Sequence, residues 1–299
     1  MLRVGYVPEH FASPLLQYAD TDQGKTFGLS PFPGGTGAMI VALQNDEIDV
    51  AVALTDALIA GIANGSQAYK LVGSYVSTPL NWAVVVGKDS KYQSIDDLRG
   101  TKLGISRVGS GSQTMASVMA MQKNWVDKDG QVEMPEFQVN NNLQGLIQRK
   151  LIRFIGCSAF LWEWFTTKPH VDTGEVRFIG SVPTPWPSWL IAAHPSSERA
   201  EPTALRNFLG KLTEYVVKFD SEEQRAQADV NFIRERFGYP EADIRAWLNT
   251  VHWVADCSAI PGKVIVDTLN ILDKAGVVKR PMDGFKVEEF VNTEVVRLV

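Results

Sequence analysis

The segment "IDVAVAL" (48–54) constrains the fold of this chain more than any other. It is an unbroken run of apolar residues after one acidic position, and such a run predicts a strand buried on both faces of its sheet. Segments with apolar residues at helical spacing flank it, at 35–47 and 55–65. Strands that alternate with helices in this way indicate a parallel or mixed sheet covered by helices. We therefore expect an α/β fold.

The alternation starts again after residue 87, which predicts a second lobe. A Pro- and Trp-rich stretch and a run of helices follow this second series. We expect two strand-like crossings between the lobes, near 76–86 and 183–193, and a chain held by two crossings can bend as a hinge. The expected boundaries are 1–80 for the first part of lobe one, 81–186 for lobe two, and 187–299 for the return into lobe one with the C-terminal helices.

Composition argues against several classes of function. The net charge is −5 and no run of Lys or Arg occurs, which disfavours a nucleic-acid-binding surface. No apolar run is long enough to cross a bilayer. Cys157 and Cys257 lack metal-ligand spacing, so we expect free thiols, no metal and no cofactor. A strand at 2–7 stands where a signal peptide would lie, which predicts a cytoplasmic protein; a mature form trimmed of its signal would be periplasmic.

A glycine- and serine-rich turn between an expected strand (103–105) and helix (113–122) is the first candidate site. No Gly-Lys-Ser/Thr follows it, and Thr114 stands where a dinucleotide fingerprint has its third glycine. What remains is a turn whose amides and hydroxyls suit a sulfonate, carboxylate or phosphate. The alternative is a plain strand-to-helix turn with a serine N-cap. The residues are Gly109, Ser110, Gly111 and Ser112.

Three further candidate groups lie in lobe one. Gly35 and Thr36 open a helix after another glycine-rich turn, where an ordinary loop is as good an explanation. Thr55 and Asp56 follow the strand 48–54 and either face a ligand or only cap the next helix. His10 and Phe11 follow the first strand. This architecture places such a turn at the mouth of a cleft, although a lone histidine is more often a surface residue.

Aromatic residues and one acid complete the candidates. Trp162 and Glu163 lie at the end of a lobe-two strand, and Trp186 lies near a crossing. Tryptophan faces stack on planar or cationic ligands, and a glutamate binds an amine or a ring nitrogen. Packing in the core is the alternative, and for Trp82, Trp186 and Trp189, near the crossings, packing at the hinge is the preferred explanation. No nucleophile elbow or other catalytic set is present, so we assign no catalytic residues.

The chain resembles the type II periplasmic-binding-protein superfamily. The resemblance is closest to the branch that binds aliphatic sulfonates, taurine and thiamine precursors, and it extends to a cytosolic fungal branch. It lies in "LRVGYVPEHFASPLLQYADTDQG", "GTGAMIVALQNDEIDVAVALTDALIAG" and "SIDDLRGTKLGISRVGSGSQTMA". The chain departs from the pattern at 149–158, where no acidic residue precedes the strand. The resemblance implies two Rossmann-like lobes that close on a small ligand.

From the resemblance we expect non-catalytic binding of a small anionic or heteroaromatic metabolite between the lobes of a monomer. An exported form would hand its ligand to an ABC permease, and a cytosolic form would be a sensor or carrier. The alternative is a biosynthetic enzyme related to thiamine-pyrimidine synthesis, with His10 as its reactive group. The cysteine-rich iron-binding motif of that enzyme family is missing here.

Overall fold

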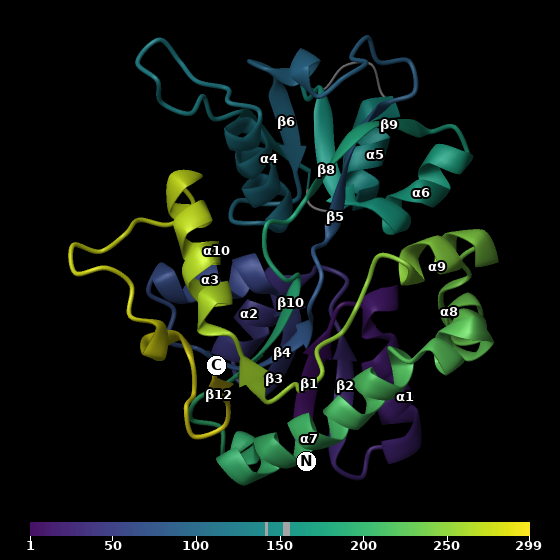
Figure 1. Cartoon of the computed structure of the whole chain (residues 1–299). Coiled ribbons are helices and arrows are strands. Elements are labelled where there is room, and N and C mark those ends of the chain that lie inside the picture. The colour runs from purple at the N-terminus through teal and green to yellow at the C-terminus, as the bar shows by residue number, and fades with distance from the viewer. Residues whose placement is uncertain (141–142, 152–155) are drawn as a thin grey trace. The chain divides into compact units, whose positions relative to one another are not determined.

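Two five-stranded sheets form the framework of the chain, one in each of two units (Figure 1). The computed structural model describes residues 1–140, 143–151 and 156–299. Unit 1 consists of Met1–Thr78, Trp186–Thr268 and Pro281–Val299. Unit 2 consists of Pro79–Pro185 and Leu269–Arg280.

The last of these segments differs from expectation. The expected return into lobe one runs from 187 to 299, whereas the structure groups Leu269–Arg280 with unit 2. Helix α10 (Gly262–Lys274) therefore begins in unit 1 and ends in unit 2. Local sequence signals such as Pro261 mark where this helix starts. They do not indicate with which unit the end of the helix is grouped.

The sheet of unit 1 is mixed. Strand β1 pairs in parallel with β2 and β3, and β10 runs antiparallel between β3 and β4. In the order β2-β1-β3-β10-β4, the strands are Phe27–Pro31, Leu2–Tyr6, Val50–Leu54, Trp189–Ala193 and Lys70–Val76. A small parallel pair, β11 (Ala259–Ile260) and β12 (Arg297–Leu298), lies elsewhere in this unit.

Helices of unit 1 come from both ends of the chain. Three follow strands in the N-terminal part: α1 (Ser13–Asp22), α2 (Thr36–Gln44) and α3 (Thr55–Ala63). The C-terminal part adds α7 (Pro202–Phe219), α8 (Asp229–Phe237) and α9 (Glu241–Leu248). Short helical turns occupy His10–Ala12, Glu198–Ala200 and Val287–Phe290, and a π-helical turn occupies Gln224–Ala228.

The sheet of unit 2 is also mixed, with β6, β7 and β8 parallel and β5 antiparallel to both β8 and β9. In the order β7-β6-β8-β5-β9, the strands are Glu136–Val139, Lys102–Ile105, Ala159–Glu163, Asn81–Gly87 and Val176–Pro183. Its helices are α4 (Gly111–Gln122), α5 (Leu143–Leu151), α6 (Trp164–Asp172) and a short turn at Asp96–Leu98.

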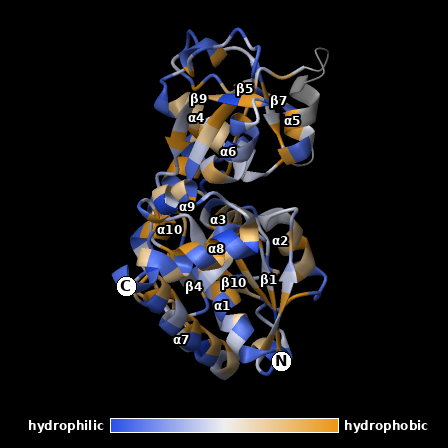
Figure 2. Ribbon diagram, turned by 90° about the vertical axis from the view of Figure 1, so that its right-hand side faces the viewer, coloured by the Kyte–Doolittle hydropathy of each residue, from blue (hydrophilic) through white to orange (hydrophobic). Residues whose placement is uncertain are grey.

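The apolar strands supply the cores. In Figure 2 the strands β1 and β10 are largely hydrophobic, whereas α7 alternates between hydrophilic and hydrophobic segments. This alternation follows from its spacing, because Leu205, Leu209, Leu212 and Val216 repeat every three or four residues and are buried. The unit 2 core includes a cluster of Ala83, Val85, Leu146, Ile147, Phe160 and Val176. No described helix is both long and apolar enough to span a bilayer.

The α/β prediction is confirmed, and most expected elements form, but β2, α6 and the short pair β11 and β12 were not expected. Strand β2 contains Gly28 and Pro31, which disfavour strands in local statistics; it lies at a sheet edge, where proline is tolerated. Strand β10 lies within the expected strand-like crossing 183–193. Helix α6 contains Pro169 and begins directly after β8. In the atypical stretch 149–158, positions 152–155 lie outside the described residues.

Candidate functional site

The carboxyl ends of four strands line up along one edge of the unit 1 sheet. Tyr6 at the end of β1 is in register with Pro31 and with Val52, and Trp189 at the start of β10 is in register with Leu54 and Val76. We call the residues beyond these ends the carboxyl edge of unit 1; they are 7–12, 32–36, Thr55, Asp56 and Ser188. Ligands of open α/β sheets bind at such an edge. The structure thus brings His10, Phe11, Gly35, Thr36, Thr55 and Asp56 to one edge of one sheet.

The start of α2 is tied to the end of β3. Gly35 is the N-cap residue with φ +72°, a conformation that glycine adopts without strain. The amide of Leu54 donates to Thr36 Oγ1 at 3.1 Å, and Thr36 is buried. Because this hydroxyl oxygen already accepts a backbone hydrogen bond, the structure gives Thr36 a structural role at the carboxyl edge.

Thr55 and Asp56 begin α3 and are almost completely buried, with exposed fractions of 0% and 2%. The Thr55 amide donates to the Ser188 carbonyl at 3.0 Å, which ties α3 to the start of β10. Thr55 Oγ1 and Asp56 Oδ2 have no hydrogen-bond partner among the described residues. Burial raises the pKa of the Asp56 carboxyl from 3.8 to about 6, although the amides of Asp56 and Ala57 partly offset this shift.

His10 lies inside an aromatic cluster. Its ring meets those of Trp247 at 4.3 Å and Tyr239 at 5.1 Å between centroids, both edge to face, and that of Phe11 at 4.8 Å. Burial lowers the pKa of the imidazole from 6.5 to about 3, so the ring is neutral at physiological pH. The expected surface-exposed alternative for His10 is wrong, because α9 and the turn before it cover the ring.

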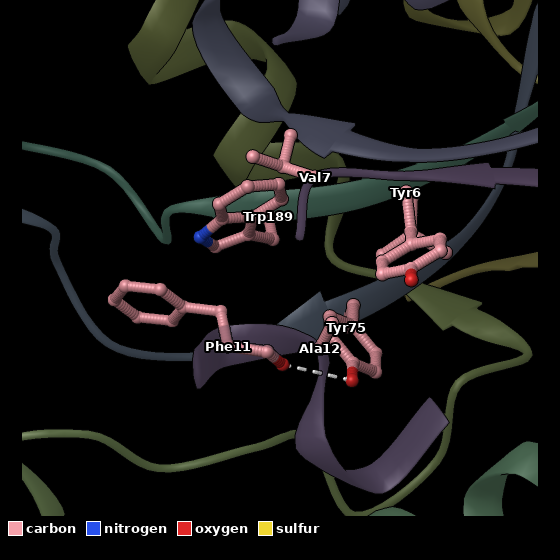
Figure 3. A pocket seen from close by; sticks show the side chains of 7 residues that line it. Tyr6, Val7, Phe11, Ala12, Tyr75 and Trp189 are labelled. Carbon is pink, nitrogen blue, oxygen red and sulfur yellow. Dashed lines mark hydrogen bonds between the residues drawn. The ribbon is translucent and has the colours of Figure 1, made fainter. Parts of the chain in front are cut away.

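A small pocket lies beside this cluster (Figure 3). Its cavity is about 10 Å³, which is room for about one water molecule. The Tyr75 hydroxyl donates to the Phe11 carbonyl at 3.0 Å across one wall, and the Trp189 ring packs on Phe11 at 5.6 Å. The lining residues are Tyr6, Val7, Phe11, Ala12, Val52, Tyr75 and Trp189.

In unit 2 the turn from β6 to α4 satisfies its own hydroxyl groups. Ser110 Oγ and Ser112 Oγ are 2.9 Å apart and both residues are buried. Ser112 Oγ also accepts from the Ser106 amide at 3.1 Å, and Ser110 Oγ accepts from the Gln113 amide at 3.4 Å. These hydroxyls therefore hold the turn, as the N-cap alternative predicts.

The two glycines of the same turn allow its backbone conformation and begin the helix. Gly109 has φ +74°, and its amide donates to Gln113 Oε1 at 2.7 Å. Gly111 is the first residue of α4. Gly111 and Ser112 belong to the first turn of the helix, whose amides have no acceptor inside the helix, so these amides are the part of the turn suited to an anion.

Glu163 is the N-cap of α6, with its Oε2 accepting from the Thr166 amide at 2.6 Å. It is 5% exposed, and burial raises the pKa of its carboxyl from 4.5 to about 7. Trp162 packs against the unit 2 core cluster, as its structural alternative predicts. Trp186 is 2% exposed and belongs to unit 1 rather than unit 2.

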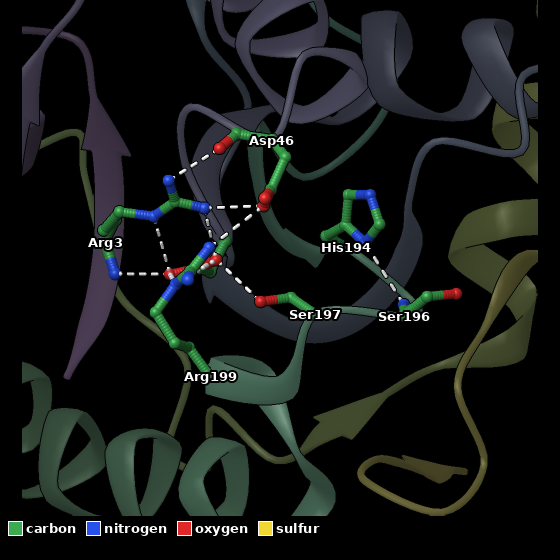
Figure 4. Close-up of polar contacts among 7 residues, drawn as sticks. Arg3, Asp46, His194, Ser196, Ser197 and Arg199 are labelled. Atoms are coloured by element: carbon green, nitrogen blue, oxygen red, sulfur yellow. Dashed lines mark hydrogen bonds and ion pairs between the residues drawn. The ribbon is translucent and has the colours of Figure 1, made fainter.

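The most specific part of the sequence resemblance, "LQNDEIDV", lies away from the carboxyl edge. Asp49 precedes β3 and is completely buried; Arg3 Nη2 donates to its Oδ1 at 2.8 Å and Arg199 Nε to its Oδ2 at 3.1 Å (Figure 4). Ser197 Oγ donates to Oδ1 at 2.7 Å. Arg3 and Arg199 also bridge to Asp46. This cluster stabilises the amino end of β3, so it is structural.

A second cavity, of about 170 Å³, lies at the amino ends of β6 and β7. Its two acids are paired, Glu133 with Arg99 at 3.0 Å and Glu136 with Lys102 at 3.3 Å. Its lining residues are Gly100, Thr101, Trp125, Glu133, Met134, Pro135 and Glu136. No group of three or more potential metal ligands occurs among residues 1–140, 143–151 and 156–299.

Several aromatic residues around the small pocket and His10 were not identified from sequence. Tyr6 is the last residue of β1 and Tyr75 the last but one of β4, and neither is marked by a turn signal. Trp247 and Tyr239 contact the His10 ring from more than 220 positions along the chain. The aromatic content of the C-terminal helices was the one available signal, and it did not indicate a partner.

Comparison with known proteins identifies these two α/β units, each with one mixed sheet, as the fold of periplasmic binding proteins. Residues 82–182 match the model of the Ca3427-like PBP family. The Candida albicans CA3427 gene product, described as defining a family with the generic periplasmic binding protein fold, has a TM-score of 0.86. It shares 28% identity over 100% of this chain and 98% of its own. The resemblance to the periplasmic-binding-protein superfamily is thus confirmed.

Two sulfonate-binding proteins share the fold at lower identity. The alkanesulfonate-binding protein SsuA from Xanthomonas axonopodis pv. citri, bound to MOPS, has a TM-score of 0.71 at 15% identity, over 100% of this chain and 98% of its own. The aliphatic sulphonate binding protein SsuA from Escherichia coli has a TM-score of 0.66 at 16% identity, over 97% and 91%. Among curated proteins, none matches the sequence.

Proposed function

We propose that this chain binds a small metabolite reversibly, without chemical turnover, at the carboxyl edges of its sheets. The observation that carries the proposal is the pair of buried, unpartnered oxygen atoms at the start of α3, Thr55 Oγ1 and Asp56 Oδ2. Buried polar atoms without a partner are rare in folded proteins and call for an explanation such as a missing ligand. The fold supports the proposal, because its solved relatives named above include sulfonate-binding proteins.

The ligand class proposed from the resemblance is a small anionic or heteroaromatic metabolite, such as a sulfonate or a pyrimidine. The first-turn amides of α4, at Gly111 and Ser112, support an anionic group. In this proposal the hydroxyls of Ser110 and Ser112 shape the turn rather than contact the ligand, because they already bond to each other and to the backbone.

Bending at the crossings is part of the proposal. The two crossings are hydrogen-bonded to one another: Leu80 donates its amide to Thr184 Oγ1 at 3.0 Å, and Ser188 donates its amide to the Thr78 carbonyl at 3.0 Å. Such a paired connection can bend as one hinge. A ligand that changes this bend changes the small-angle scattering curve, and an unchanged curve at saturating ligand removes this part of the proposal.

The test of binding begins with mass spectrometry of small molecules released from the purified protein, followed by a thermal-shift screen of sulfonates and pyrimidines. A ligand at a hundred times its dissociation constant stabilises the folded state by roughly 2.7 kcal/mol, which raises Tm measurably. Release of the same molecule unchanged after incubation supports binding without turnover. A protein that retains nothing and responds to no compound contradicts the proposal.

Turnover is the competing prediction. An iron-dependent conversion that is lost in His10→Ala, in a variant that still folds, would favour the biosynthetic enzyme over the binding protein.

Localisation is a separate proposal: we propose a cytoplasmic carrier or sensor, and fractionation of the producing cells tests it.

A further inference from the structure

The start of α3 contains two polar side chains that the fold does not use fully. Thr55 and Asp56 are 0% and 2% exposed, and Thr55 Oγ1 and Asp56 Oδ2 lack a partner among the described residues. Both residues follow β3 directly, at the carboxyl edge of unit 1, beside the first residues of β10. Orphan oxygen atoms on two consecutive residues at this edge define a candidate subsite.

The neighbouring polar groups at this edge are already satisfied. Thr36 Oγ1 accepts from the Leu54 amide, and the Thr55 amide donates to Ser188. The Ser188 hydroxyl donates to the Thr78 carbonyl at 2.9 Å, so it too is engaged elsewhere. None of these hydrogen bonds serves Asp56 Oδ2, which leaves it open to a partner from outside this part of the fold.

The chemistry of the two orphan atoms restricts that partner. A carboxylate oxygen only accepts hydrogen bonds, and a threonine hydroxyl both donates and accepts. A sulfonate or carboxylate group placed here would meet a like charge, which is unfavourable at short range. A group with N–H bonds satisfies both atoms, and a cationic one gains a charge-assisted hydrogen bond.

Resting on the proposed binding function, we propose that the ligand presents an N–H donor to Asp56 Oδ2 and makes its second contact with Thr55 Oγ1. An ammonium group or an amino-substituted heterocycle supplies such a donor. An anionic end of the same ligand would lie elsewhere, away from Asp56. This assigns a nitrogen-containing metabolite as the substrate class, in place of a simple anion.

Two matched pairs of probes test the inference by titration calorimetry on the full chain. Taurine and ethanesulfonate differ in an ammonium group, and 4-aminopyrimidine and 4-methylpyrimidine differ in an amino group. We expect the member with the ammonium or amino group, called here the nitrogen-bearing probe, to bind at least roughly tenfold more tightly than its partner, because it alone offers an N–H donor to the carboxylate.

Variants separate the subsite from general effects of removing a buried acid. Asp56→Asn is expected to weaken binding of the nitrogen-bearing probe roughly ten- to hundredfold. Asp229→Asn is the matched control, because Asp229 is also buried with an orphan Oδ2 but lies on α8 beside Gln17 of α1. The control is expected to bind as the wild type does.

Thr55→Val keeps the side-chain shape and removes the orphan hydroxyl, so it stays informative if Asp56→Asn does not fold. We expect an equal or higher Tm without ligand and weaker binding of the nitrogen-bearing probe. Equal affinity within both pairs, or full affinity in Asp56→Asn, overturns the inference while leaving the binding function intact. Failure of all four probes overturns it too, and the released-ligand experiment then decides separately whether the protein binds anything.

Discussion

The histidine after the first strand illustrates how burial changes the chemistry of a single residue. In the sequence, His10 follows "VPE" and reads as an exposed turn residue. In the structure, three aromatic rings surround it, and burial lowers the pKa of its imidazole to about 3. A histidine with such a pKa is neutral between pH 5 and 8, so it is not a proton carrier in this state.

This burial predicts a pH-dependent stability contribution from His10. The unfolded chain binds a proton at this residue below about pH 6.5 and the folded protein does not, so stability is lost as pH falls below 6.5. Between pH 7 and pH 5 the loss amounts to about 2 kcal/mol. Urea unfolding of wild type and His10→Phe at both pH values measures it, and the variant is expected to lose about 2 kcal/mol less on acidification.

The direct check is an NMR titration of the His10 ring, assigned by comparison with the variant. Its signals are expected to stay at the neutral position from pH 8 down to pH 4. A midpoint near pH 6 would show that the ring is open to water, and it would remove the physical basis of the prediction.

At the scale of elements, ion pairs connect three segments at the amino end of β3. Asp49 accepts from the Arg3 amide at 2.9 Å and from both guanidinium groups, which come from β1 and from the turn after β10. These contacts hold the pKa of the Asp49 carboxyl well below its usual range, chiefly because the hydrogen bonds outweigh the cost of burial. The motif that supports the family resemblance therefore holds the start of β3 against β1 and against the turn after β10.

Removing this charge is expected to destabilise the fold. Asp49→Asn leaves Arg3 and Arg199 without their shared carboxylate, and we expect a loss of roughly 2–3 kcal/mol in the free energy of unfolding. A fully buried pair would cost more, but these arginine side chains are about a third exposed. Asp46→Asn is the matched control, because Asp46 joins the same arginines from an exposed position and its loss has a much smaller effect.

Denaturant unfolding at pH 7 measures both variants. Equal effects of the two substitutions would contradict the assignment of Asp49 as the centre of the cluster. Because the pKa of Asp49 is lowered, its contribution is present above about pH 4 and is lost as pH falls further. The difference between wild type and Asp49→Asn is therefore expected to shrink in acid.

At the scale of the whole molecule, three buried acids dominate the response to pH. Burial raises the pKa of Asp56 to about 6 and those of Glu163 and Asp229 to about 7. Between about pH 4 and these values, the folded protein holds protons that the unfolded chain has lost, so stability falls as pH rises. The combined change in stability with pH from these three acids is larger than the opposite change from His10.

We therefore expect a higher Tm at pH 5 than at pH 8. Asp229→Asn removes the destabilisation that comes from ionising one of the three buried acids, and it changes no residue of the carboxyl edge. It is expected to raise the free energy of unfolding at pH 8 by on the order of 2–4 kcal/mol. At pH 5 the folded acid is protonated while the unfolded carboxyl has ionised, so the stability gain of the variant is expected to shrink to roughly 1–2 kcal/mol, and it vanishes only below about pH 4. Scanning calorimetry at the two pH values checks both statements, and a wild-type Tm that rises with pH would contradict them.

The sequence by itself determined the elements whose signals are local. The apolar run before Thr55, the helical spacing of α4 and α7, and the glycine turns at Gly35 and Gly109 all predicted elements that form. Hydrophobic periodicity, helix caps and turn residues are patterns within a few consecutive residues, so they can be recognised in one sequence. The class of fold followed from their order, and the family resemblance followed from the same segments.

Only the tertiary structure decided which side chains meet. The insertion of β10 between β3 and β4, the enclosure of His10 by Trp247, and the pairing of Asp49 with Arg199 join residues more than a hundred positions apart. No local pattern records such contacts, because register and packing depend on the whole sheet. For the same reason the hydroxyls of Ser110 and Ser112 have hydrogen-bond partners and Asp56 Oδ2 has none among the described residues. In the sequence, both groups were equally good candidates for contact with a ligand.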